Sequence, residues 1–216
     1  GAGPAGALRL GFTGSAAYEA VPRLLQAFRT EYPKVDIEIY ESTTTELLRR
    51  IESQALDVAL VAYPVLEDTS AQILLLRHER LMAAVRIDSQ LAQRSEVTLA
   101  ELAQVPFIIH SRSQAPHMHF IVLHAFQQAG IQPRVVQQAV QVSSMLGLVE
   151  GGMGVALVSA MVAGHVSDHV KLLPLAGPGS DLDLGMGIAT LPDAQTPTAR
   201  NFVRLAQRVL GEPSAG

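Results

Sequence analysis

Apolar and polar positions follow two different spacings along the chain, and each spacing predicts one kind of element. The run at 56–62 is continuously apolar, as in a strand covered on both faces, whereas 35–41 alternates apolar and polar residues as a half-buried strand does. Segments 17–32 and 117–129 carry apolar residues at helical spacing. The chain is therefore expected to alternate strands with helices.

The complete set of expected elements indicates an α/β fold. We expect strands at 8–12, 35–41, 56–62, 73–85, 106–110, 133–138, 154–159, 169–175 and 181–190. We expect helices at 17–32, 42–53, 98–105, 117–130, 141–152 and 196–210. Strands that alternate with helices at short spacing imply parallel sheets.

The strand expected at 73–85 is long and charged in its middle, which suggests a crossing between two lobes. The helix at 196–210 has no sheet of its own, so the chain is expected to return to the first lobe. We therefore expect two Rossmann-like lobes joined by two crossover strands. Lobe I would comprise 1–77 and 183–216, and lobe II 78–182, with a ligand in the cleft at the carboxyl ends of the strands.

Composition and charge exclude several classes of function. Of 216 residues, 48% are apolar and only 17% are charged, which is typical of a globular protein. The net charge of −4 repels phosphate backbones, so this chain alone is not expected to bind DNA. There is no cysteine, no apolar run long enough to span a membrane, and no signal-peptide pattern at the start. We expect no association with a membrane.

Two hydroxyl-bearing turns follow expected strands, at 13–15 and 42–44. The start of a helix offers free N–H groups that suit a carboxylate, but serine and threonine there often only cap the helix. Ligand binding and helix capping both stay open as roles of these turns. A nucleophilic Ser15 is not expected, because "FTGSA" is not the G-x-S-x-G turn of hydrolases and no partner base is evident. We expect no catalytic residues.

Histidines and glycines offer no cofactor motif. The chain has no H-E-x-x-H pattern, and "GGMG" at 151–154 follows a helix instead of a strand, so neither a metal nor a dinucleotide is expected. His110, at a strand end, is the histidine expected to face a ligand, and the others are expected at the surface or at helix starts. The apolar excess of helices 17–32 and 117–129 suggests a subunit interface.

Five segments in a fixed order resemble the effector-binding domain of LysR-type transcriptional regulators. They are "LRLGFTGSAAYEAVPRLLQAFRTEYPKVDIEIYE", "TTELLRRIESQALDVALV", "LLLRHERLMAAV", "TLAELAQVPFIIH" and "GLVEGGMGVALVSA". The resemblance covers 8 to about 210 and is greatest to the branch that senses aromatic-degradation metabolites. It implies a periplasmic-binding-protein-like (type 2) fold, a small aromatic or carboxylated effector, a cytoplasmic homodimer or tetramer formed through 17–32 and 117–129, and DNA binding only through an N-terminal domain absent from this chain.

The resemblance also implies effector contacts in the first lobe. The family's serine after the first strand matches Ser15, and its threonine after the second strand matches Thr44, with Thr43 as neighbour. In the related branch, a basic residue after the third strand helps to hold a carboxylate. Here that position is Ala62, followed by Tyr63, which departs from the pattern and puts a dicarboxylate effector in doubt.

The second lobe would supply the rest of the site. The loop after "PFII" begins at His110, and Pro116 and Met118 match positions that line the pocket in the related branch. Arg112 could replace the charge missing at Ala62, or the effector carries a single acidic group.

Two other classes of protein share such a fold. A solute-binding receptor of a transport system is the alternative interpretation, distinguished by an export signal or a lipid-anchor cysteine. An enzyme would need a nucleophile–base set, such as Ser15 with His110 and a carboxylate.

Overall fold

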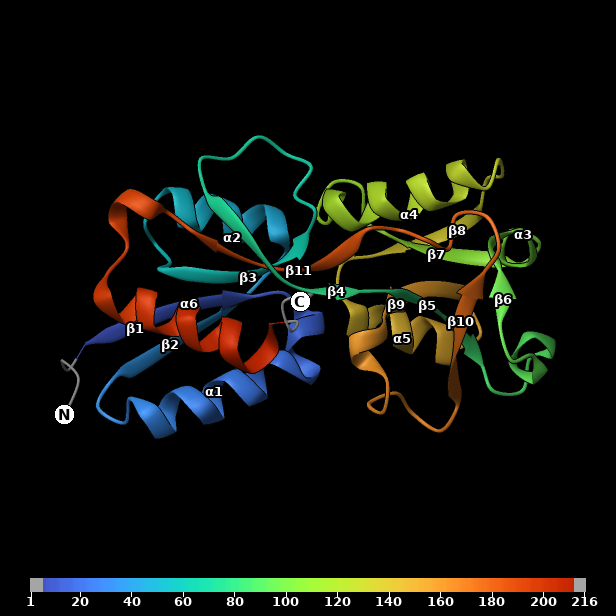
Figure 1. Cartoon of the computed structure of the whole chain (residues 1–216). Helices are drawn as coiled ribbons and strands as arrows, with labels where there is room; N and C mark the ends of the chain where they lie inside the picture. Colours follow the sequence, from blue (N-terminus) through green and yellow to red (C-terminus); the bar gives the residue numbers. More distant parts are fainter. Residues whose placement is uncertain (1–5, 212–216) are drawn as a thin grey trace, which may run out of the picture. The chain divides into compact units, whose positions relative to one another are not determined.

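The computed structural model describes residues 6–211, and the chain divides into two compact units. Unit 1 contains the residues up to His78 and from Leu184 onward, and unit 2 contains Glu79–Asp183. Each unit has one β-sheet with helices on both of its faces (Figure 1). The predicted α/β class is confirmed.

The sheet of unit 1 has the order β2-β1-β3-β11-β4. Its strands are β1 (Ala7–Phe12), β2 (Asp36–Glu41), β3 (Val58–Tyr63), β4 (Gln72–Glu79) and β11 (Leu184–Thr190). Its helices are η1 (Gly14–Tyr18), α1 (Ala20–Glu31), α2 (Thr44–Glu52), η4 (Pro192–Ala194) and α6 (Pro197–Leu210). Helices α1 and α6 pack together on one face of the sheet, and α2 covers the opposite face (Figure 1).

The sheet of unit 2 has the order β6-β10-β5-β9-β7-β8. Its strands are β5 (Leu81–Arg86), β6 (Val97–Thr98), β7 (Pro106–His110), β8 (Arg134–Ala139), β9 (Val155–Ser159) and β10 (Val170–Ala176). Its helices are η2 (Gln90–Gln93), α3 (Leu99–Leu102), α4 (Pro116–Gln128), α5 (Val142–Glu150) and η3 (Ala160–Val162). Helices α4 and α5 lie on opposite faces of this sheet (Figure 1).

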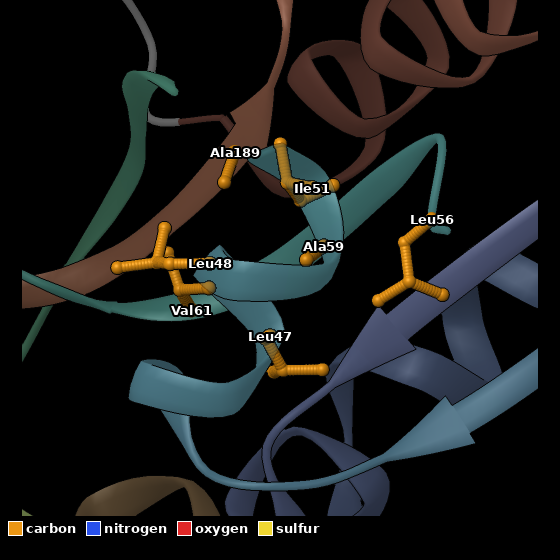
Figure 2. Close-up of a cluster of buried hydrophobic side chains, with 7 residues drawn as sticks. All are labelled: Leu47, Leu48, Ile51, Leu56, Ala59, Val61 and Ala189. Carbon is orange, nitrogen blue, oxygen red and sulfur yellow. The ribbon is translucent and has the colours of Figure 1, made fainter. Parts of the chain in front are cut away.

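Helix α2 is held on its sheet by a compact apolar cluster, which fixes where its N-terminus lies. The cluster consists of Leu47, Leu48, Ile51, Leu56, Ala59, Val61 and Ala189 (Figure 2). A Cβ atom at Gly11 would lie 2.6 Å from a methyl carbon of Leu56 and 2.7 Å from one of Leu47. Glycine at this position of β1 therefore allows the strand to pass directly beneath the cluster.

Three sequence-based expectations about the elements are wrong in detail. The helix expected at 17–32 is a short 3₁₀ helix, η1, followed by α1 from Ala20. The single strand expected at 73–85 is two strands that break at Arg80 and belong to different sheets. The sheets are mixed, because β11 runs antiparallel to β3, and β5 antiparallel to β9 and β10.

The other expected strands and helices are found within a few residues of their predicted bounds. Helix 196–210 returns to the first sheet as predicted, since α6 packs on α1 and β1. Within residues 6–211, no helix is both long and apolar enough to cross a membrane.

Candidate functional site

The carboxyl ends of three parallel strands bring the two hydroxyl-bearing turns of unit 1 together. Strand β1 lies between β2 and β3 and runs parallel to both. The N–H of Thr13 donates to the carbonyl oxygen of Leu60 (3.3 Å), and the N–H of Ser42 donates to that of Phe12 (3.1 Å). The turns at 13–15 and 42–44 are therefore held side by side at one edge of the sheet.

Thr44 connects the start of α2 to the end of β3. Its side chain is buried, and its hydroxyl oxygen accepts a hydrogen bond from the N–H of Ala62 (3.2 Å). Neither Thr44 nor Thr43 caps α2 through its side chain, so the capping interpretation is wrong for this helix. The hydroxyl of Thr44 instead engages the end of β3. That hydroxyl still has a hydrogen to donate.

The N-terminus of α2 presents backbone donors to a ligand. The first helical hydrogen bond runs from the N–H of Leu47 to the carbonyl of Thr43. The N–H groups of Thr44, Thr45 and Glu46 precede it and have no side-chain cap within residues 6–211. Such a helix start, with its partial positive charge, suits a carboxylate.

Ser15 lies half-buried in η1, in the turn that is held beside 42–44. Its hydroxyl makes no hydrogen bond to any described residue, and Thr13 does not cap η1 through its side chain. No histidine or carboxylate is bonded to Ser15, so the structure gives it no base for nucleophilic chemistry. Tyr63, at the end of β3, is half-buried beside Ala62.

In unit 2, the loop that follows β7 leads into the first turn of α4. The N–H of Ser111 donates to the carbonyl of Ala139 (2.8 Å), which fixes the start of the loop on β8. Pro116 and Met118 are half-buried in the first turn of α4. Strand β7 ends at His110, as predicted, and the loop from there leads to both residues.

Arg112 is exposed in this loop. Its guanidinium lies 5.9 Å from the ring centroid of Phe120, and its backbone N–H donates to the side-chain oxygen of Gln138 (3.2 Å). Among the described residues it has no carboxylate partner. Its positive charge is therefore available to an anion.

Three histidines around this loop are buried, with exposures of 7% for His110, 4% for His117 and 8% for His119. The ring Nδ1 of His119 donates to the carbonyl oxygen of His110 (2.8 Å). Nδ1 of His110 and both ring nitrogens of His117 have no hydrogen-bond partner in the described part of the chain. Burial lowers the pKa of His110 and of His117 to about 4, and for His110 the nearby His119 and His117 add to the effect. Both rings are neutral at pH 7.

His117 and His119 lie at a helix start, as expected of the remaining histidines, but both side chains are buried. The sequence contains a signal for their burial, because His117 shares a helical face with Ile121, and His119 shares one with Val122 and Phe126. Within 6–211, no group of three or more metal-ligating side chains could hold a metal ion.

Two grooves lie away from these residues. One of about 480 Å³ in unit 2 is lined by Leu123, Phe126, Gln127, Gly130, Ile131, Gln132, Pro133 and Val135. Another of about 580 Å³ in unit 1 is lined by Arg23, Gln26, Ala27, Thr30, Glu31 and Val209. Neither contains a residue expected to contact an effector.

The structure thus gathers the expected contacts into two sets, one in each unit. Unit 1 holds Ser15, Thr43, Thr44, Ala62 and Tyr63 around the carboxyl ends of β1, β2 and β3. Unit 2 holds His110, Arg112, Pro116 and Met118 around the end of β7 and the start of α4.

Comparison with known proteins agrees with this fold and with the segments noted in the sequence. The LysR substrate binding domain family matches residues 1–211. The Hca operon transcriptional activator HcaR of Escherichia coli K12 is 31% identical over 212 residues, which cover 96% of this chain and 69% of HcaR. The chain thus spans about two thirds of that relative's length.

Two solved structures are also similar. The effector-binding domain of BenM with its effector benzoate has a TM-score of 0.83 at 25% identity, covering 97% of this chain and 96% of that one; BenM is a regulator of Acinetobacter baylyi. The effector-binding domain of QuiR in complex with shikimate has a TM-score of 0.86 at 21% identity and covers 96% and 98%. These similarities confirm the predicted periplasmic-binding-protein-like (type 2) fold.

Proposed function

Because the chain belongs to the LysR substrate binding domain family, we propose that it binds a small monocarboxylate effector and that the residue set of unit 1 holds its acidic group. The chain is the effector-binding domain of a LysR-type transcriptional regulator and not an enzyme. A solute-binding receptor of a transport system is not favoured, because the family match and HcaR both point to regulation.

The start of α2 carries the proposal. Three backbone N–H groups, at Thr44, Thr45 and Glu46, precede the first helical bond without a side-chain cap, and the free hydroxyl of Ser15 lies at the neighbouring strand end. This arrangement provides several donors and a helix dipole of the correct sign for one carboxylate. The family's serine and threonine positions correspond to Ser15 and Thr44.

The charge around these donors favours a single acidic group. Ala62 occupies the position that is basic in the related branch, so unit 1 offers no second cation there. Tyr63 is half-buried at the end of β3 and provides apolar surface for the remainder of the effector. In unit 2, Pro116 and Met118 are half-buried and apolar as well. The exposed Arg112 is the residue that would accept a second acidic group if the effector had one.

The role of the full-length regulator follows from the same reasoning. This acidic chain senses the effector, and a DNA-binding domain outside it contacts the operator in the cytoplasm. Helices α1 and α4 would form the dimer or tetramer contacts. For the signal to reach DNA, the effector must bind one state of the regulator more tightly than another.

The proposal is tested by titrating benzoate into the wild-type chain and into Ser15→Ala and Thr43→Val, with calorimetric measurement of Kd. Loss of one hydrogen bond to a carboxylate should weaken binding about tenfold in Ser15→Ala. The control is Ser53→Ala, at the other end of α2, where the hydroxyl bonds only to the carbonyl of Arg50. Equal affinity of both site variants and the wild type would rule out this carboxylate anchor.

A further inference from the structure

The imidazole of His117 is a buried polar group that the described chain leaves without a partner. Its side chain is 4% exposed, and neither Nδ1 nor Nε2 is hydrogen-bonded. A neutral imidazole has one donor and one acceptor, and burying both unpaired costs folding free energy. Folded proteins pair nearly all such groups, so this ring is a candidate to bond with a bound molecule.

The position of His117 associates it with ligand binding. It lies in the first turn of α4, between Pro116 and Met118, at the helix start that follows β7. The two histidines nearby do not satisfy it, because the Nδ1 of His119 is bonded to the carbonyl of His110 and the Nδ1 of His110 is itself unpaired. Two neutral rings with unused hydrogen-bonding capacity therefore adjoin the proposed effector contacts of unit 2.

The chemistry of these rings favours a neutral polar group. Burial lowers the pKa of His117 to about 4, so the ring is uncharged at pH 7. A second carboxylate here would face no cation from these rings. A hydroxyl group both donates and accepts, as a neutral imidazole does, and can pair with the ring without any change of charge.

We propose that His117 is a specificity residue that hydrogen-bonds a hydroxyl group of the effector, and that the effector is therefore a hydroxylated monocarboxylate. This inference rests on the proposed function, which gives the effector its carboxylate. Sites that hydrogen-bond a substrate hydroxyl discriminate strongly against an analogue without it, because the buried protein group is then left unpaired.

The test compares pairs of acids that differ only in hydroxyl groups. Calorimetric Kd values are measured for shikimate against 1-cyclohexene-1-carboxylate, and for the three hydroxybenzoates against benzoate. We expect the wild type to prefer a hydroxylated member of at least one pair about tenfold or more. His117→Leu should abolish this preference while leaving the affinity for the unhydroxylated acid unchanged.

The matched control is His124→Leu, which removes an exposed histidine of the same helix that bonds to Gln128. It should retain the preference. If His117→Leu does not fold, His117→Phe gives the same readout, with an aromatic ring that has no polar atoms.

The outcomes separate this inference from the proposed function. Equal binding of both members of every pair by the wild type, or a preference that persists without His117, would overturn the role of His117 but leave the carboxylate anchor standing. Failure of the wild type to bind any of these acids would overturn both.

Discussion

The buried hydroxyl of Thr44 has a structural role that substitution can test. Its hydroxyl oxygen accepts a hydrogen bond from the N–H of Ala62 at 3.2 Å in a buried position. Thr44→Val leaves the N–H of Ala62 unpaired and should lower the free energy of unfolding by about 1–3 kcal/mol. Thr44→Ser keeps the hydroxyl, so its free energy of unfolding should fall much less. Urea denaturation measures both, and equal stability of the valine variant and the wild type would contradict the assignment of this bond.

The buried histidines should make stability depend on pH. The pKa of His110 and of His117 is lowered from 6.5 to about 4 by burial, so the unfolded chain binds more protons than the folded chain between these values. Their contribution is fully present above pH 6.5 and is lost as the pH falls towards 4. The loss is about 3 kcal/mol for each ring.

This prediction is checked by measuring the free energy of unfolding from pH 7.5 to 4.5. The free energy of unfolding should depend less steeply on pH in His117→Leu than in the wild type, because one of the two rings no longer titrates. His124→Leu, which removes an exposed histidine of the same helix, is measured beside them as the control. Identical slopes for all three proteins would refute the burial-induced shift.

At the scale of elements, two threonines that begin helices should respond differently to truncation. The side chain of Thr196 accepts from the N–H of Ala199 (3.1 Å) and caps α6, whereas Thr43 makes no such bond at α2. Thr196→Ala should cost about 1 kcal/mol of unfolding free energy, and Thr43→Ala less than about 0.5 kcal/mol. Thermal unfolding of the two variants tests this contrast, and an equal loss in both would contradict it.

Most elements could be predicted from the sequence, because local spacing and capping residues determine where each begins and ends. The pairing of the strands within each sheet could not be predicted. The break at Arg80 has no glycine or proline to mark it; β4 and β5 separate because each joins a different sheet. The antiparallel direction of β11 likewise follows from the return of the chain to unit 1, which is a tertiary property.

The candidate site, like the fold, could be predicted only where local sequence determines it. The position of the hydroxyl turns at 13–15 and 42–44, side by side after neighbouring strands, was predictable from the sequence. That Thr44 bonds to Ala62 instead of capping α2 could not be predicted, because the bond joins residues from two elements. The buried pair His117 and His119 could have been identified from helical periodicity, but their hydrogen bonds could not.

At the scale of the whole molecule, we assign effector sensing to this chain and DNA binding to a separate domain. The chain has a net charge of −4 and matches the LysR substrate binding domain family over residues 1–211, whereas HcaR extends well beyond the region it shares with this chain. A ligand that binds only the folded state stabilises it by about 2.7 kcal/mol at a concentration one hundred times its Kd. Effector binding should therefore be detectable as a rise in the melting temperature of this chain by itself.

The central claim is that the start of α2 and Ser15 hold the carboxylate of the effector. The most direct measurement is a titration of the ¹⁵N-labelled chain with benzoate, followed by amide chemical shifts. We expect the largest shifts at the N–H groups of Thr44, Thr45 and Glu46, with Ser15 next. Shifts confined to the grooves at 123–135 or 23–31, with none at the start of α2, would contradict the account.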